Sequence, residues 1–496
     1  MICVTLGRSR HKRMIAEHQY LVEQGADLVE LRLDFIGRAV SLSRLLNDRP
    51  GPVVITARRR GDGGRWLKSE EERVMLLRSA IAAGVEYVDI EADIASQIPR
   101  YGKTKRIISY HDMDETPDNL EELHAAMSEE DADIVKIATM ANSFSDNLRM
   151  IELVKAAKIP TIGICMGETG ILTRILANRL GSPFTYATFS SGRQMAPGQL
   201  DWKQMKDLYR YDTIDEKTEF FGVVADPVAH SYSPLIHNRA FQDQKINARY
   251  FPLRVSKSDL PDFLQQTNKL GISGLSVTIP HKEEALAYCT QAESSAKGIG
   301  AVNTLVFNGD EKLGYNTDYR AAMDCIDELF SIDRESGRSM RGMTALVLGA
   351  GGVSRAIAWG LKQRNAEVMI SSRTFERTQI LAAEIGCKAI EWEFRHDPRI
   401  NLLVNGTPVG MHPDVDSSPY SASAMNQYLA VFDTVYNPEN TLLIKQAKRA
   451  QCRIITGIDM FVRQATYQYK LFTGKEAPYD LMKRTIKEAT NPVQLN

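Results

Sequence analysis

The chain has 496 residues, of which 43% are hydrophobic and 25% are charged, and its formal net charge at neutral pH is −1. This length predicts roughly two to four domains of ordinary globular composition. The balanced charge gives no reason to expect nucleic acid or an anionic membrane as a partner, and nothing in it indicates an oligomer. No apolar run reaches the length of about 18 residues that a membrane-spanning helix needs.

Six cysteines are scattered along the chain without a C-x-x-C pair. This pattern argues against a disulfide framework and against a metal site, and it is typical of a reducing compartment. Residues 1–7 have the pattern of a strand and lack the charged and apolar regions of a signal peptide. We therefore expect a cytoplasmic protein without a bound metal.

Short apolar segments recur between amphipathic stretches in the first two hundred residues. The predicted strands are residues 2–6, 28–33, 53–57, 87–91, 106–110, 134–138, 161–165 and 184–188. Amphipathic stretches such as 14–24 and 70–83 lie between them. Eight such β-α units predict a compact (β/α)8 barrel, in which chemistry takes place at the C-terminal ends of the strands.

The predicted strand 134–138 carries Lys136 within an apolar run. A buried lysine is costly unless it is paired, or unless it loses its proton and becomes a nucleophilic amine. The alternative is a lysine that extends out of the strand end into solvent. Lys136 alone does not decide between these interpretations.

The ends of the other predicted strands are unusually polar. They carry Glu30, Arg32, Arg58, Asp89, Glu91, His111, Arg174 and Gln199. Arg58 and Arg174 favour an anionic small substrate. His111 near Lys136 favours an imine-forming amine with a base beside it.

These motifs resemble the type I 3-dehydroquinate dehydratase family across nearly all of residues 1–205. The matching pieces are Glu30-Leu-Arg32, Thr-Ala-Arg58, Ser-Tyr-His111-Asp, Asp-Ile-Val-Lys136-Ile-Ala, Gly-Ile-Leu-Thr-Arg174 and Ala-Pro-Gly-Gln199. The resemblance implies that Lys136 forms a Schiff base with the substrate ketone, that His111 moves the proton, and that Arg174 pairs with the carboxylate. It also implies that the substrate hydroxyls are held by Thr5, Glu30, Arg32, Arg58 and Gln199.

Two positions depart from the family pattern. Asp62 stands where the family often has a glutamate that orients the histidine, and it is one methylene shorter. Met195 stands where serine or threonine is usual, and its thioether is a poor hydrogen-bonding group. Both departures bear on the strength of the dehydratase activity and leave the nucleophile and the base in place.

The junction between the halves, residues 201–218, is polar with interspersed aromatics and contains neither glycine nor proline. It is therefore not a loose tether. We expect a helix over 202–209, a short linker, and a new strand that starts at 219.

The second half begins with hydroxyl and amine groups near strand ends. Ser231 and Ser233 precede a helix opened by Pro234, where they could bind a carboxylate or simply cap the helix. Further along the chain are Thr278, Lys282, Asn303 and Asp318, which end strand-like segments and could converge.

A predicted strand, 344–348, leads into a glycine turn and a helix. The turn reads Gly349-Ala350-Gly351-Gly352-Val353-Ser354, the arrangement that binds dinucleotides. The next strand ends in Ser372-Arg373-Thr374, with Arg377 beyond and no acidic residue at its tip. This pair of arginines favours NADP over NAD, and the alternative is that both lie on a solvated helix start.

This half resembles the shikimate dehydrogenase family from about residue 219 to 490. The matching pieces are His-Ser231-Tyr-Ser233-Pro, Ser-Val-Thr278-Ile-Pro-His-Lys282-Glu, Gly-Ala-Val-Asn303-Thr, Tyr-Asn-Thr-Asp318, Gly-Ala-Gly-Gly352, Ser-Arg373-Thr, Asn405-Gly-Thr-Pro and Gln464. The resemblance implies that Lys282, held beside Asp318, is the acid/base group at the carbonyl. It implies carboxylate binding by Ser231 and Ser233, hydroxyl binding by Thr278, Asn303, Asp318 and Gln464, a site lined by Tyr436, and a nicotinamide flanked by Gly457 and Met460.

The two resemblances share an intermediate, because the dehydratase product, 3-dehydroshikimate, is the dehydrogenase substrate. We expect a barrel over 1–205, a linker over 206–218, a substrate domain of α/β type over 219–325, a Rossmann NADP domain over 326–456 and returning C-terminal helices over 457–496. Three alternatives stay open: a chain in which only the dehydrogenase works well, a non-catalytic sensor of pathway metabolites, and oxidation of quinate with NAD.

Overall fold

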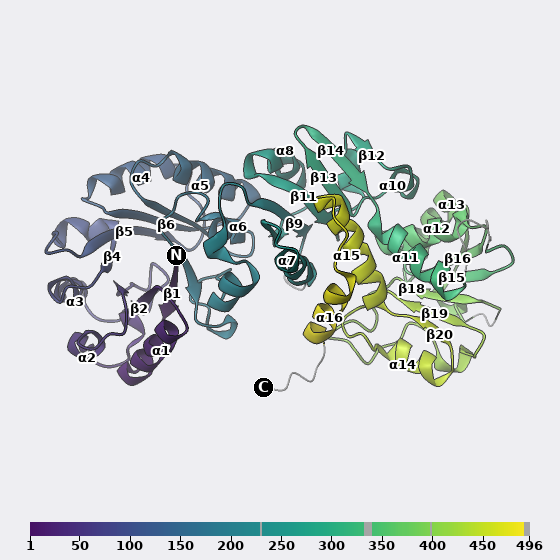
Figure 1. Cartoon of the computed structure of the whole chain (residues 1–496), viewed down its shortest axis with the longest axis horizontal. Coiled ribbons are helices and arrows are strands. Elements are labelled where there is room, and N and C mark those ends of the chain that lie inside the picture. The colour runs from purple at the N-terminus through teal and green to yellow at the C-terminus, as the bar shows by residue number, and fades with distance from the viewer. Residues whose placement is uncertain (229–230, 332–339, 397–398, 491–496) are drawn as a thin grey trace. The chain divides into compact units, whose positions relative to one another are not determined.

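The computed structural model describes residues 1–228, 231–331, 340–396 and 399–490 (Figure 1). The chain divides into two compact units. The first unit comprises Met1–Thr218 with Leu253–Phe263, and the second comprises Glu219–Pro252 with Leu264–Asn496. Among the described helices, none is both long and apolar enough to cross a membrane.

Eight parallel strands form the centre of the first unit. They are β1 (Ile2–Leu6), β2 (Leu28–Arg32), β3 (Val53–Thr56), β4 (Tyr87–Glu91), β5 (Lys105–Asp112), β6 (Ile134–Met140), β7 (Thr161–Met166) and β8 (Thr185–Thr188). The order β7-β6-β5-β4-β3-β2-β1-β8 makes a nearly closed barrel. This strand order confirms the predicted barrel. Its apolar strands are buried on both faces, so helices must cover the outer face.

Helices alternate with these strands. They are α1 (His11–Glu23), α2 (Leu42–Leu46), α3 (Glu70–Ala82), α4 (Leu120–Glu129), α5 (Phe144–Ala156) and α6 (Ile171–Leu176). The parallel register sets Lys136 of β6 opposite Ser109 of β5 and Ile162 of β7. His111 of β5 lies opposite Ala138, two residues after Lys136, so both side chains belong to the same end of the barrel.

The junction differs from its prediction as a regular helix over 202–209. Gln204–Leu208 form a π-helix, in which the Tyr209 amide donates to the Gln204 carbonyl over 3.0 Å, and a 3-10 helix covers Tyr211–Thr213. Tyr211 and Ile214 are buried, 0% and 2% exposed. These two side chains are thus buried within the first unit, although the stretch is otherwise polar.

A mixed six-stranded sheet opens the second half of the chain. Its strands are β9 (Glu219–Ala225), β10 (Ala248–Arg254), β11 (Ile272–Val277), β12 (Gln291–Ala292), β13 (Thr304–Asn308) and β14 (Glu311–Tyr315), in the order β10-β9-β11-β13-β14-β12. Its helices are α7 (Ser233–Asp243), α8 (Leu260–Leu270), α9 (Glu284–Ala287), α10 (Ser294–Ile299) and α11 (Thr317–Leu329).

A parallel sheet with the order β17-β16-β15-β18-β19-β20 follows. Its strands are β15 (Thr344–Leu348), β16 (Glu367–Ser371), β17 (Lys388–Ile390), β18 (Leu402–Asn405), β19 (Ala430–Asp433) and β20 (Arg453–Ile455), with helices α12 (Gly352–Gln363), α13 (Phe375–Ile385) and α14 (Leu442–Arg449). This is the doubly wound dinucleotide fold, whose order reverses between β15 and β18, at the start of α12.

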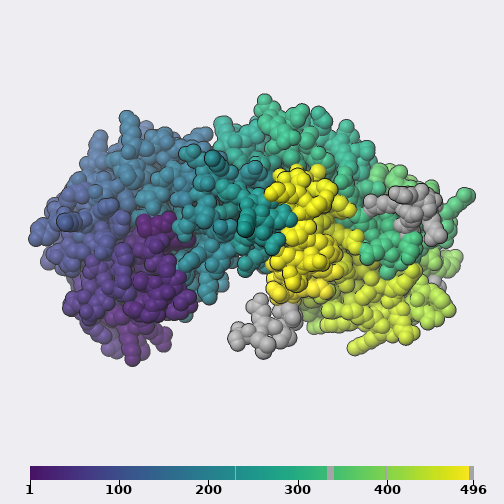
Figure 2. All heavy atoms as spheres, viewed as in Figure 1, coloured from purple at the N-terminus to yellow at the C-terminus, as the bar shows by residue number. Residues whose placement is uncertain are grey.

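The last helices, α15 (Gly457–Thr473) and α16 (Tyr479–Thr490), leave the parallel sheet and pack beside the mixed one. Ile458, Val462, Tyr469 and Met482 belong to the same buried cluster as Phe221 of β9. Both helices form part of the surface of the second unit, yellow in Figure 2. Helix α15 therefore reaches the cavity where the two sheets of this unit meet.

Candidate active sites

Lys136 is buried in the first unit, 5% exposed, and lines a cavity at the C-terminal ends of the strands. Its Nζ donates to Asp89 Oδ2 at 2.8 Å and lies 4.1 Å from the ring centroid of Tyr186. The side chain therefore points into the barrel, and the alternative of a lysine extending into solvent is excluded.

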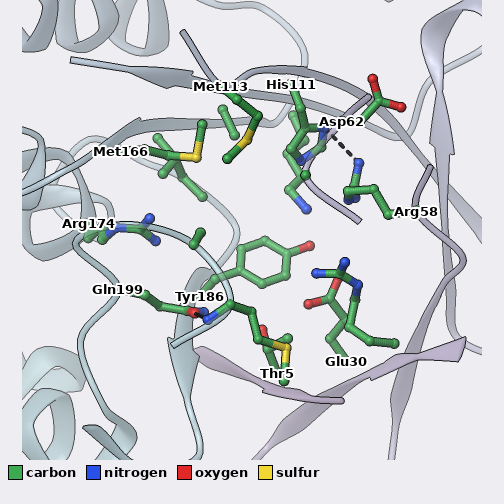
Figure 3. A pocket seen from close by; sticks show the side chains of 17 residues that line it. Thr5, Glu30, Arg58, Asp62, His111, Met113, Met166, Arg174, Tyr186 and Gln199 are labelled. Carbon is green, nitrogen blue, oxygen red and sulfur yellow. Dashed lines mark hydrogen bonds between the residues drawn. The ribbon is translucent and has the colours of Figure 1, made fainter. Parts of the chain in front are cut away.

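His111 and Arg58 point toward one another in Figure 3, and both line the cavity that Lys136 also lines. Arg58 Nη1 lies 2.7 Å from His111 Nδ1, and Arg58 Nη2 lies 2.9 Å from Asp89 Oδ1. Burial, together with the charges of Arg58 and Lys136, holds the pKa of His111 well below its usual range. His111 is therefore neutral at neutral pH and able to accept a proton.

Arg174 of α6 lines the same cavity and has no acidic partner among the described residues. It is 2% exposed, its Nε lacks a hydrogen bond, and its Nη2 reaches only the Pro197 carbonyl at 3.5 Å. Burial lowers its pKa to about 10. A buried, uncompensated guanidinium is costly on its own, so its surroundings suit an anion that enters the cavity.

The other predicted contacts of this site also line the cavity. They are Thr5, Glu30, Arg32, Arg58 and Gln199. Glu30 accepts from Thr56 Oγ1 at 2.7 Å, and Thr5 Oγ1 has no hydrogen-bond partner within the described chain. All eight predicted residues of the barrel site are thus brought together.

Asp62 and Met195 line the cavity too. Asp62 Oδ2 accepts from Arg59 Nε at 2.7 Å, and no hydrogen bond to His111 joins it within the described residues. In this structure Arg58, rather than the carboxylate at position 62, contacts the histidine ring.

Sequence reasoning left out two residues that contact the amine, Asp89 and Tyr186. Asp89 is a polar residue at a strand end, but none of the quoted family motifs includes it. Tyr186 lies in the predicted eighth strand, two residues after the apolar Phe184. That spacing places both side chains on the same face of the strand and is the only indication in the sequence that Tyr186 faces inward.

The second cavity lies in the second unit and has a volume of about 420 Å³. It contains all predicted residues of the shikimate site, namely Ser231, Ser233, Thr278, Lys282, Asn303, Asp318, Tyr436 and Gln464. Val353, Gly457 and Met460 of the predicted cofactor set also line it. The polar strand ends therefore converge as expected.

Lys282 Nζ donates to Asp318 Oδ2 at 2.5 Å, and both side chains are about one-tenth exposed, 11% and 10%. Asn303 is held in place through Thr317, whose amide donates to Asn303 Oδ1 at 2.7 Å. Ser233 lies at the first turn of α7, and its amide donates to Ser231 Oγ at 3.3 Å. Hydroxyls and amides at a helix N-terminus suit a carboxylate.

Two further residues of this cavity, Ser276 and Gln468, were missed. Gln468 Oε1 accepts from Ser276 Oγ at 2.9 Å, and Gln468 Nε2 donates to the Asn303 carbonyl at 3.2 Å. Gln468 follows the predicted Gln464 by four residues on α15, so helical spacing could have indicated it.

The glycine turn before α12 has the close packing that a dinucleotide site needs. Gly349 has φ +109°, and a Cβ there would lie 2.8 Å from Ser354 Oγ. A Cβ at Gly351 would meet nothing within 4 Å, and one at Gly352 would lie 3.2 Å from Lys282 Cδ. The turn thus leaves room beside its backbone, close to the predicted acid/base group.

The residues predicted to bind the 2′-phosphate of NADP lie just beyond β16. Ser372 Oγ donates to the Thr374 carbonyl at 2.9 Å, which fixes the turn. Arg373 and Arg377 are exposed, and no ion pair joins either to a carboxylate of the described residues. These donors fit the phosphate-bearing ribose of NADP.

Fold and cavities together define an enzyme with a lysine-containing (β/α)8 barrel and a dinucleotide-dependent dehydrogenase region. The family model for type I 3-dehydroquinase matches residues 2–216, that for the shikimate dehydrogenase substrate binding domain matches 223–305, and that for the shikimate 5′-dehydrogenase C-terminal domain matches 457–487. The chain is 37% identical, over 97% of its length and 83% of the relative's, to the chloroplastic bifunctional 3-dehydroquinate dehydratase/shikimate dehydrogenase of Arabidopsis thaliana. It therefore belongs to the family of bifunctional 3-dehydroquinate dehydratase/shikimate dehydrogenases.

Single-activity relatives match the second half. A shikimate dehydrogenase (NADP(+)) of Methanococcoides burtonii is 40% identical over 54% of this chain and 98% of its own. A crystal structure of a shikimate dehydrogenase in complex with NADP+ superposes with a TM-score of 0.53 and 31% identity, covering 56% of this chain and 98% of that one.

Proposed function

We propose that the barrel cavity dehydrates 3-dehydroquinate through a Schiff base on Lys136. The observation that carries this proposal is a buried amine that shares one cavity with a neutral histidine and with an arginine that has no acidic partner among the described residues. Arg174 would bind the substrate carboxylate, and Thr5, Glu30, Arg32, Arg58 and Gln199 would hold the hydroxyls.

In this mechanism the Lys136 ammonium, paired with Asp89 at rest, gives up a proton, and its free amine adds to the substrate ketone. The oxygen of that ketone leaves as water with the two protons that the ammonium loses, which gives a protonated imine. His111 then removes the C2 proton, because the cationic imine withdraws electrons from the adjacent carbon. The same imidazolium returns its proton to the C1 hydroxyl, which departs as water. Hydrolysis of the imine releases 3-dehydroshikimate and restores Lys136, so the net change is the loss of one water.

The second cavity would reduce 3-dehydroshikimate to shikimate with NADPH. Lys282 donates a proton to the carbonyl oxygen as that oxygen becomes a hydroxyl, and Asp318 holds the ammonium in position. Ser231 and Ser233 bind the carboxylate, while Thr278, Asn303, Asp318 and Gln464 hold the ring hydroxyls and Tyr436 lines the site. NADPH, when bound, supplies the hydride.

For the cofactor, the turn Gly349-Ala350-Gly351-Gly352-Val353 would hold the pyrophosphate at the N-terminus of α12. The 2′-phosphate would contact Ser372, Arg373, Thr374 and Arg377, and Gly457 and Met460 would flank the nicotinamide. The absence of an acidic side chain in the first turn of α12 supports an anion there.

We assign the dehydratase to residues 1–205, the linker to 206–218, the substrate domain to 219–325, the NADP domain to 326–456 and the returning helices to 457–496. The partners are these small-molecule substrates. A reducing compartment such as the cytoplasm fits six free cysteines, three of which are buried.

The test supplies dehydroquinate and NADPH and follows both 3-dehydroshikimate and shikimate. Borohydride added with dehydroquinate is expected to reduce the imine and leave a covalent adduct on Lys136, located by peptide mass spectrometry. Lys136→Ala should lose the adduct and the first step while keeping the second step, and Lys282→Ala should do the opposite. An adduct that persists in Lys136→Ala would refute the assignment.

A further inference from the structure

Tyr186 is an inward-facing residue of β8 that no sequence motif marked and that the mechanism above does not use. Its side chain is 4% exposed and lines the barrel cavity together with Lys136 and Arg174. Figure 3 shows its ring in the middle of the cavity, with the hydroxyl directed away from Arg174. The phenol thus lies where the body of a substrate must pass or bind.

The Tyr186 hydroxyl is buried and has no hydrogen-bond partner among the described residues. Buried polar groups without a partner are rare in native proteins, because each loses its hydration and gains nothing in return. Thr5 Oγ1 and Arg174 Nε also line the cavity without a hydrogen-bond partner among the described residues. Both are proposed substrate contacts, and the hydroxyl of Tyr186 is a group of the same kind.

The face of the Tyr186 ring contacts the nucleophile. Lys136 Nζ lies 4.1 Å from the ring centroid, a cation–π distance, while its other contact is Asp89 Oδ2 at 2.8 Å. The amine is therefore held between a carboxylate and an aromatic face, and the phenol oxygen belongs to the same wall of the cavity. Burial, with the nearby charge of Glu30, raises the pKa of Tyr186 well above its usual range, so the hydroxyl remains a hydrogen-bond donor.

We propose that the Tyr186 hydroxyl donates a hydrogen bond to a substrate oxygen on or next to the carbon that becomes bonded to Lys136, while its ring positions the amine for attack. This inference rests on the proposed Schiff base and adds to it a group that fixes the reacting end of the substrate. Arg174 would bind the carboxylate at the other end, so the six-membered ring of the substrate would be held at both ends.

Tyr186→Phe separates the two roles, because phenylalanine keeps the ring and removes only the hydroxyl. We expect the dehydratase kcat/KM to fall about 10- to 100-fold, the range for losing one buried hydrogen bond to a substrate. Borohydride trapping should still label Lys136 but at a slower initial rate. The thermal midpoint should stay the same or rise, since the hydroxyl has no hydrogen-bond partner to lose among the residues that the structure describes.

Tyr211→Phe is the matched control, a buried tyrosine of the same unit that lies outside the cavity. We expect this variant to keep the dehydratase kcat/KM of wild type. Both variants should also keep wild-type dehydrogenase activity, which shows that the chain is folded. A normal kcat/KM in Tyr186→Phe would overturn the proposal, as would a loss of activity that comes with a lowered unfolding midpoint. Failure of wild-type protein to form a borohydride adduct would instead refute the Schiff base itself.

Discussion

Asp89 is the buried carboxylate that contacts both Lys136 and Arg58. It accepts hydrogen bonds from Ser109 Oγ at 2.6 Å and Lys136 Nζ at 2.8 Å, and it pairs with Arg58 at 2.9 Å. Burial alone would raise its pKa, but the charges of Arg58 and Lys136 outweigh burial and hold the pKa well below its usual range. Asp89 is therefore an anion throughout the working pH range and a counter-ion for any cation formed on Lys136.

Asp89→Asn removes that charge with little change of shape. The asparagine amide would place an N–H donor against the cationic donors Arg58 and Lys136 and would remove the carboxylate with which both pair. We therefore expect the dehydratase kcat/KM to fall at least about 100-fold. Trapping of Lys136 by borohydride should slow in parallel, while the dehydrogenase keeps its rate.

The control is Asp93→Asn, in the turn after the same strand. Asp93 pairs with Arg59 at the surface, its side chain 57% exposed, and such pairs contribute little to stability. We expect nearly wild-type kinetics from it. A dehydratase that tolerates Asp89→Asn as well as it tolerates Asp93→Asn would contradict the role of Asp89.

His111 predicts the pH dependence of the dehydration step. Burial and two neighbouring cations, Arg58 and Lys136, lower its pKa from the ordinary value of 6.5. The acid limb of a kcat/KM profile reports the base of the free enzyme, so it should lie below pH 6.5. A pH titration of initial rates checks this, and a limb above that value would show that another group is the base.

Much of the barrel site could be predicted from the sequence because its residues lie at strand ends. Arg58, His111 and Lys136 each interrupt or end an apolar run, which is a visible signal. Asp89 and Tyr186 could not be assigned in this way, since their importance depends on which strands become neighbours and which side chains meet across the barrel. No pattern within one strand records the 4.1 Å approach of Tyr186 to Lys136.

At the scale of elements, Asp433 joins the ends of neighbouring strands in the parallel sheet. From the end of β19, its Oδ1 accepts from Asn405 Nδ2 of β18 and from the Val435 amide, both at 3.0 Å, and its Oδ2 accepts from Thr441 Oγ1 at 2.5 Å. The segment after β19 carries Thr434 and Tyr436 into the dehydrogenase cavity. Asp433 therefore fixes one wall of that site.

Burial raises the pKa of Asp433 to about 6, from an ordinary value of 3.8, despite these hydrogen bonds. The folded state thus keeps a proton that the unfolded chain releases, so this group stabilises the fold below about pH 4 and loses that contribution as pH rises through 6. Asp433→Asn does not titrate, so it serves as the reference. The free energy of unfolding of wild type, measured relative to this variant, should fall by roughly 3 kcal/mol as the pH rises between these limits.

Urea unfolding of both proteins at several pH values between 4 and 8 measures this difference. The amide donors of the asparagine add a destabilisation that does not depend on pH. The direction in which the stability difference changes with pH therefore follows from the raised pKa alone. A stability difference that does not change with pH would mean that Asp433 titrates normally in the folded protein.

Element types were easier to predict than element ends. The strands of the barrel and the strand–turn–helix at Gly349 follow from apolar runs bounded by glycine or charge. The π-helix Gln204–Leu208 could not be predicted, because its i to i+5 pairing leaves no mark in the local residue pattern. Local sequence favoured a regular helix, which is the far commoner winding.

For the whole molecule, each cavity is lined by residues of a single unit. The barrel cavity draws on residues between Thr5 and Gln199, and the dehydrogenase cavity on residues between Val223 and Gln468 that belong to the second unit. Among the described residues, neither cavity is lined by a side chain of the other unit, so each activity should survive loss of the other. The intermediate, a small carboxylate, is then able to reach the second cavity through solvent.

Mixing two single variants tests this separation. Lys136→Ala alone should convert no dehydroquinate, and Lys282→Ala alone should stop at 3-dehydroshikimate. An equimolar mixture with NADPH should form shikimate after a lag, while 3-dehydroshikimate accumulates to the level at which the second enzyme keeps pace with the first. If the mixture forms the intermediate but no shikimate, the second site accepts its substrate only from the barrel of its own chain, and the two activities are not independent.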